Sequence, residues 1–261
     1  MADRNAAEAS KKDKPTHSTV KLAGVDLAWQ SKKNPTAIAV GILKDSHLNI
    51  TEIHQGLFSI ESVIDCLGAL GDLKGVAIDA PLVIKNQSGQ RLCERELGRE
   101  YSSRHASCHT SNLKLYPQAD SVRLSNHLFN AGFQHLGEVT TKWQIECYPH
   151  PAIIEIFELS ERLKYKKGKV AAKREGQKVL ASLIKSLATS RDLALHIPQE
   201  IQPIVENQRI DSLKGKALKH NEDVLDSILC LYVAALYQQS HQHLVFGDTS
   251  EGYIYVPTFS C

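Results

Sequence analysis

Long apolar runs are missing from this sequence of 261 residues. No stretch approaches the ~20 apolar residues that cross a bilayer, and no apolar core of a secretory signal precedes the first expected strand. The six cysteines are scattered, and none forms a Cys-x-x-Cys pair. The sequence therefore predicts a protein with no membrane partner, in a reducing compartment: the cytoplasm or, in a eukaryote, the nucleus.

An excess of one charge sign is also missing. Lysine and arginine total 31 and aspartate and glutamate total 29, which gives a formal net charge of +2. A preference for nucleic acid would therefore have to come from local basic patches rather than from the field of the whole molecule. The oligomeric state stays open at this level.

The pattern of apolar residues predicts one α/β domain over residues 19–261, after a polar tail at residues 1–18 that we expect to be disordered. We expect a central mixed sheet with helices on both faces and a helical insertion, at about 84–142, after the fourth strand. The expected strands cover residues 20–28, 36–43, 47–54, 75–81, 143–148, 243–246 and 253–256. The expected helices cover residues 59–70, 91–99, 119–133, 149–157, 169–187 and 221–239.

Five acidic residues are expected at positions where ligands bind in such a fold. Asp26 and Asp79 each end an apolar strand, and Glu146 lies among apolar neighbours on a third. Asp223 and Asp226 share one face of the last long helix, near its expected start, where the helix dipole favours an anion. Carboxylates brought together repel one another, and Mg²⁺ or Mn²⁺ relieves that repulsion. Two such ions about 4 Å apart would support phosphodiester hydrolysis.

The chain order of these acids resembles that of the ribonuclease H-like superfamily, especially its Holliday-junction-resolvase branch. There an acid on the first strand, another on the fourth and an Asp-x-x-Asp pair on the last helix bind metal. Asp26, Asp79, Asp223 and Asp226 stand at the matching positions. The resemblance implies a ribonuclease H-like fold and a metal-dependent nuclease.

More narrowly, the chain resembles a widespread family of predicted ribonuclease H-like nucleases. It departs from many relatives after the first aspartate, where Leu27-Ala-Trp29 replaces a glycine-rich turn. The matching segments are Gly24-Val-Asp26, Ile78-Asp79-Ala-Pro81, Arg91-x-Cys93-Glu-Arg95-Glu-Leu97, Glu146-Cys-Tyr148-Pro-His150-Pro151, Leu163-Lys-Tyr165-Lys-Lys-Gly168, Asp223-x-x-Asp226-Ser-x-x-Cys and Gly252-Tyr-Ile-Tyr255-Val-Pro257.

Basic residues near these acids are candidates for binding substrate phosphate. The alternatives are local pairing with neighbouring glutamates and a solvated helix face. His150 follows Glu146 and is a candidate to relay protons or contact phosphate; its alternative role is to cap the next helix. The candidate phosphate ligands are Arg91, Arg95, Lys164, Lys166, Lys167 and Arg174.

Three functions compete. The first is a nuclease that hydrolyses DNA or RNA by a two-metal carboxylate mechanism. The second is phosphoryl transfer or nucleotide hydrolysis, as in actin-like kinases, but the chain has no glycine-rich loop after Asp26. The third is a non-catalytic module that binds nucleic acid through its basic segments.

Overall fold

The computed structural model describes residues 19–29 and 34–259. The predicted disordered tail at residues 1–18 lies outside this range. The strands are β1 (Val20–Asp26), β2 (Thr36–Lys44), β3 (His47–Leu57), β4 (Leu73–Asp79), β5 (Gln134–His135), β6 (Trp143–Glu146), β7 (Ala194–His196), β8 (His243–Asp248) and β9 (Gly252–Pro257). The helices are α1 (Ile60–Ala69), α2 (Leu92–Tyr101), α3 (Asp120–Asn130), α4 (Pro149–Ile156), α5 (Val170–Ser186), α6 (Asn207–Ser212) and α7 (Gly215–Gln238), with short 3₁₀ turns at Leu187–Thr189 and Gln202–Val205.

One mixed sheet forms the centre of the molecule, with strand order β5-β6-β4-β1-β2-β3-β7. The first three strands make the expected antiparallel meander. On the other side of β1, strands β4, β6 and β5 run parallel to it. The prediction of an α/β protein with a mixed sheet is confirmed.

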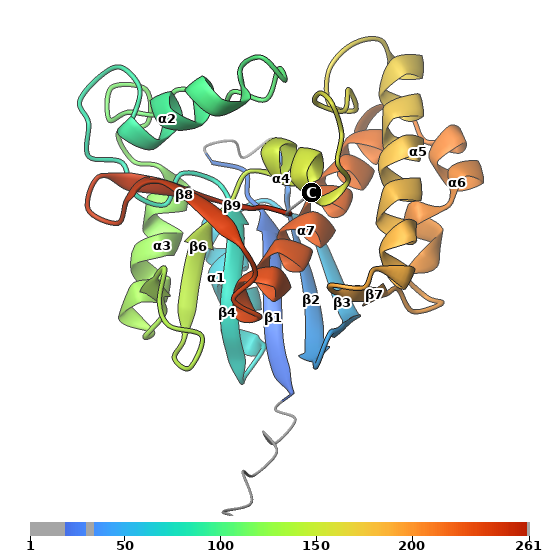
Figure 1. Ribbon diagram of the computed structural model, residues 1–261, viewed down its shortest axis with the longest axis horizontal. Coiled ribbons are helices and arrows are strands. Elements are labelled where there is room, and N and C mark those ends of the chain that lie inside the picture. The colour runs from blue at the N-terminus through green and yellow to red at the C-terminus, as the bar shows by residue number, and fades with distance from the viewer. Residues whose placement is uncertain (1–18, 30–33, 260–261) are drawn as a thin grey trace, which may run out of the picture.

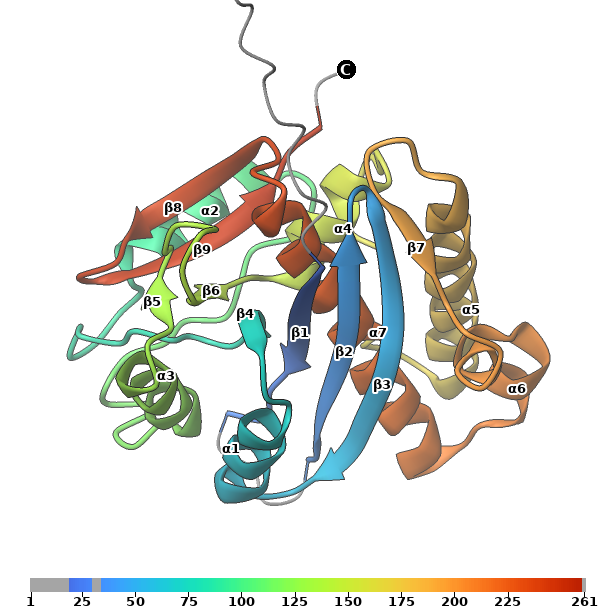
Figure 2. The same cartoon turned by 90° about the horizontal axis from the view of Figure 1, so that it is seen from below.

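Helices cover both faces of this sheet, as expected. The helices α4, α5 and α7 pack against one face and share its larger apolar core, and α7 crosses the central strands diagonally (Figure 1). Helices α1 and α3 pack against the other face, over a second apolar core (Figure 2). No helix in the described part of the chain is both long and apolar enough to cross a membrane.

The contact between α7 and β1 is unusually close. A Cβ atom added to Gly24 would lie 1.9 Å from the backbone N of Leu231 and 2.4 Å from the backbone O of Ser227. Glycine therefore lets the two backbones touch, and α7 is fixed across the strand just before Asp26. The helix begins at Gly215, earlier than expected, so Asp223 lies in its third turn and the predicted stabilisation by the helix dipole is wrong.

Only part of the region predicted as an insertion, residues 84–142, lies outside the central sheet and its apolar cores. Strand β5 joins the edge of the sheet beside β6. Leu124 and Leu128 of α3 are buried in the core of the second face, because the apolar residues of that helix recur on one side. What stands apart is α2, which packs on the hairpin of β8 and β9 (Figure 1).

Candidate functional site

The two strand-end acids lie side by side. Strands β1 and β4 are parallel neighbours, and Asp26 and Asp79 are Cα partners in their register. Parallel strands end at the same edge of a sheet, which is where ligands bind in α/β proteins. Both aspartates line a cavity of about 450 Å³ at this edge.

Helix α7 brings two more carboxylates to the same place. Asp223 and Asp226 are 3% and 0% exposed, and Ser227, which touches β1 at Gly24, fixes their height above the strand. Burial, followed by the charge of Asp226, raises the pKa of Asp26 well above its usual value. Burial also raises the pKa of Asp79 to about 6, against the opposing effect of Lys166. The structure thus brings together four of the five predicted metal ligands.

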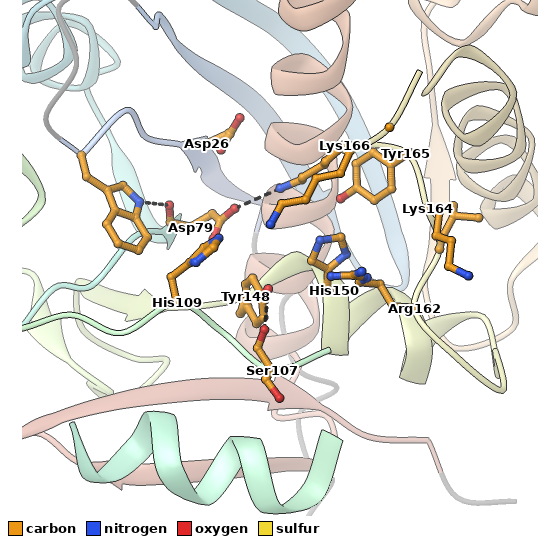
Figure 3. A pocket seen from close by; sticks show the side chains of 14 residues that line it. Asp26, Asp79, Ser107, His109, Tyr148, His150, Arg162, Lys164, Tyr165 and Lys166 are labelled. Carbon is orange, nitrogen blue, oxygen red and sulfur yellow. Dashed lines mark hydrogen bonds and ion pairs between the residues drawn. The ribbon is translucent and has the colours of Figure 1, made fainter. Parts of the chain in front are cut away.

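Two lysines form ion pairs with this group of four acids, which is called here the carboxylate cluster: Asp26, Asp79, Asp223 and Asp226. The Nζ atom of Lys166 lies 2.8 Å from Asp226 Oδ2 and 3.7 Å from Asp79 Oδ2 (Figure 3). Although burial favours a neutral amine, these carboxylates hold the pKa of Lys166 well above its ordinary value. On α7 itself, Lys219 Nζ lies 2.6 Å from Asp223 Oδ1.

In this structure lysine ammonium groups, and not a grouping of metal ligands, compensate the carboxylate cluster. Within residues 19–29 and 34–259, no three histidine, cysteine, aspartate or glutamate side chains are grouped to hold one. Asp223 Oδ2 is nevertheless buried and accepts no hydrogen bond, which is costly for a carboxylate oxygen, while Asp226 Oδ2 is held by the Lys166 ammonium at 2.8 Å. Oxygens of this kind suit Mg²⁺ or Mn²⁺, so the donor chemistry fits such an ion once Lys166 withdraws.

The segment that carries Lys166 is held from both sides. Tyr165 is fully buried, and its hydroxyl donates a hydrogen bond of 2.6 Å to Asp226 Oδ1. Behind it, Gly176 of α5 lets the backbone approach closely, since a Cβ there would lie 2.1 Å from Lys164 O. We had not predicted a role for Tyr165. A single aromatic residue within a run of lysines was the available signal.

Glu146 is paired with an arginine instead of with the lysines of the carboxylate cluster, and it lines a small adjoining pocket together with Asp79. Its Oε1 atom is 2.5 Å from the guanidinium of Arg91, and the backbone N–H of Leu82 donates to its Oε2 at 2.9 Å. Arg91 also pairs with Glu94 at 2.8 Å. Both side chains of the Arg91–Glu146 pair are almost fully buried. The structure therefore places Arg91 in a buried ion-pair network, as the alternative of local pairing expected, and away from any exposed phosphate position.

The other predicted phosphate ligands divide into two groups. Lys164 and Lys167 line the cavity together with Lys166. Arg95 is exposed and donates to the backbone O of Gln90 at 2.8 Å, and Arg174 donates to the backbone O of Leu213 at 3.1 Å. Neither arginine is among the cavity-lining residues. The basic run thus approaches the carboxylate cluster only through the segment before α5.

His150 reaches the cavity from the first turn of α4. It is 7% exposed and lies edge-on to Tyr148 and Tyr165, with ring centroids 5.5 and 5.4 Å away. Burial and then the charge of Lys166 lower the pKa of His150 to about 2. Its imidazole is therefore neutral, and its Nδ1 atom is buried with no hydrogen-bond partner. It is suited to hydrogen bonding rather than to supplying a positive charge.

Several cavity residues were not singled out from the sequence: Trp29, Ser107, His109, Tyr148 and Arg162. Trp29 follows β1 closely enough that its place beside Asp26 was foreseeable. Ser107 and His109 come from the long connection after α2, where no periodic pattern indicated a position.

Comparison with known proteins gives one match. No curated protein and no solved structure matches the chain significantly. A family model described as "Protein of unknown function (DUF429)" matches residues 24–251, a range that contains every residue of the carboxylate cluster and the cavity wall. The chain therefore belongs to the DUF429 family.

Proposed function

We propose that this protein is a Mg²⁺- or Mn²⁺-dependent nuclease with a ribonuclease H-like fold. The observation that carries the proposal is the pairing of Asp26 with Asp79 across β1 and β4, with Asp226 of α7 close to both. Support for the fold comes from the strand order: three antiparallel strands, a helix, and a fourth strand parallel to the first. This is the arrangement that the resemblance implies.

The acidic and basic residues of the site would have different roles. The carboxylate cluster would hold the metal, which when bound supplies the positive charge that activates water and stabilises the leaving oxygen of a phosphodiester. Lys166, released from Asp79 and Asp226, would bind a substrate phosphate at the same wall as Lys167 and Arg162. The neutral His150 would donate or accept a hydrogen bond at the cavity floor.

A cleavage assay on single-stranded and double-stranded DNA and RNA tests the proposal. Cleavage should need Mg²⁺ or Mn²⁺ and stop in EDTA. Asp26→Asn and Asp226→Asn should each lower the rate of cleavage by more than about a hundredfold. Mutating a residue that only supports a metal ligand already lowers metal affinity or activity by about 10- to 100-fold, and these acids would be ligands themselves. Asp72→Asn, at an exposed position, is the matched control. Cleavage that survives EDTA or both cluster substitutions would overturn the proposal.

One observation favours a second candidate. The carboxylate cluster is already partly compensated by Lys166 and Lys219, so it does not require a metal in order to be buried, and the cavity could belong to a module that binds nucleic acid without one. Such a module would bind DNA or RNA equally well in EDTA and in the Asp26→Asn variant, and would release it as salt rises. It would cleave neither.

A further inference from the structure

One wall of the cavity carries a fixed aromatic ring. Trp29 lies just beyond Asp26, and its indole N–H donates a hydrogen bond of 3.3 Å to the backbone O of Asp79. Tyr116 supports it edge-on, with ring centroids 5.5 Å apart. The side chain is only partly buried, so the indole is held beside the acids while part of its surface stays open to the cavity.

The cavity is polarised along its length. Figure 3 shows Asp79 and His109 on one side, Arg162 and Lys164 on the other, and Lys166 reaching across between them. Because Trp29 is bonded to Asp79, its ring lies on the Asp79 side of the cavity, opposite Arg162 and Lys164 (Figure 3). The cavity therefore has the indole of Trp29 at one end and cations at the other, with Lys166 and its carboxylate partners between them. A nucleotide has the matching parts: a flat base at one end and an anionic phosphate at the other.

We propose that this cavity takes one unpaired nucleotide of a single strand, with its base stacked on Trp29 and its phosphate at the Lys166 side. The proposal rests on the proposed nuclease function and names the substrate that it would act on. A cavity of about 450 Å³ is in the size range of small-ligand sites. A base that is still paired and stacked could not enter it without leaving its partner. Stacking on an aromatic ring accepts any base, so little sequence preference is expected.

Binding of an oligothymidylate with phosphorothioate linkages, which resist hydrolysis, tests this in Mg²⁺. The chain has two tryptophans, and Trp143 is fully buried in the core, so quenching of fluorescence by the strand reports on Trp29. Affinities of the variants are measured by anisotropy of a labelled strand. Trp29→Ala should weaken binding about tenfold or more, whereas Trp29→Phe, which keeps an aromatic face, should stay within about threefold of wild type. A duplex of equal length should bind at least about tenfold more weakly than the single strand.

Three results would overturn the inference: wild-type affinity in Trp29→Ala, equal losses in Trp29→Ala and Trp29→Phe, or a duplex that binds as tightly as the strand. Equal losses would mean that Trp29 acts through its hydrogen bond to Asp79, which phenylalanine cannot make. Thermal melting of each variant checks that it is folded. If the protein binds the strand through Trp29 but never cleaves nucleic acid, this inference stands and the proposed nuclease function fails. If the Trp29→Ala variant cleaves nucleic acid at the wild-type rate, the nuclease function stands and this inference fails.

Discussion

At Lys166 a lysine ammonium holds the carboxylate oxygens that the proposed metal would need. The ammonium lies 2.8 Å from Asp226 and 3.7 Å from Asp79, where a divalent ion would need to bind. Its side chain is 23% exposed, which leaves a short route toward the cavity. The lysine compensates buried carboxylates, and for the same reason it would oppose binding of the proposed metal.

Replacing Lys166 with methionine separates these two effects. In EDTA, Lys166→Met should lower the free energy of unfolding by up to about 3 kcal/mol, because buried carboxylates lose a counter-ion. In titration calorimetry the same variant should bind Mn²⁺ about tenfold more tightly, a gain of about 1.4 kcal/mol, since no ammonium has to be displaced. Lys164→Met, on the same segment but 69% exposed, should change neither quantity. Unchanged or weaker Mn²⁺ binding in Lys166→Met would show that the lysine does not compete.

At the scale of elements, the contact between α7 and β1 positions the site. The strands bring Asp26 and Asp79 together by register alone, but Asp223 and Asp226 depend on where a helix crosses the sheet. That crossing is set at Gly24, where the backbone of α7 takes the space of a side chain. The height of two carboxylates above the strand ends therefore depends on one glycine.

Gly24→Ala tests this dependence. Its Cβ would meet backbone atoms of α7 within 2.5 Å, and backbone cannot move aside as a flexible side chain can. We expect a loss of at least about 3 kcal/mol in urea unfolding, at the upper end of the cost of overpacking a core. Gly68→Ala in α1 is the matched control, because a Cβ there meets nothing within 4 Å, and alanine should stabilise that helix by up to about 1 kcal/mol. Equal stability of the two variants would contradict the role given to Gly24.

The sequence predicted those elements whose signals are local. Apolar strands ending in Asp26 and Asp79 were recognisable, and so was the helix that carries Asp223 and Asp226. The start of α7 was missed because its first two turns, residues 215–222, contain only Ala217 and Leu218 as apolar residues, and of these two only Leu218 is buried. Strands β5 and β7, of two and three residues, are too short to show alternation.

The unpredicted parts of the site depend on long-range pairing. Arg91 and Glu146 are 55 positions apart, so nothing local indicated that this arginine would pair with this acid. Lys166 and Asp226 are likewise joined only by the fold. Charge pattern and spacing identified four of the acids and three of the lysines that gather at this end of the sheet, but tertiary packing decided which acid meets which base.

At the scale of the whole molecule, the site draws on nearly the full length of the chain. The cavity is lined by the ends of β1 and β4, the connection after α2, the start of α4 and the segment before α5, and α7 adds the buried acids beside it. The molecule as a whole is nearly neutral, so the gathering of acids and lysines at the cavity is a local feature. Binding of a phosphate would therefore be governed by this cavity rather than by the overall charge.

The central claim is that the carboxylate cluster binds a hard divalent cation in place of Lys166. The most direct test is a crystal soaked in Mn²⁺, with the metal located by its anomalous scattering. We expect a peak coordinated by Asp26, Asp79 and Asp226, with the ammonium of Lys166 moved away from both Asp79 and Asp226. A soaked crystal with no peak at the carboxylate cluster, and with Lys166 still paired to Asp226, would contradict the claim.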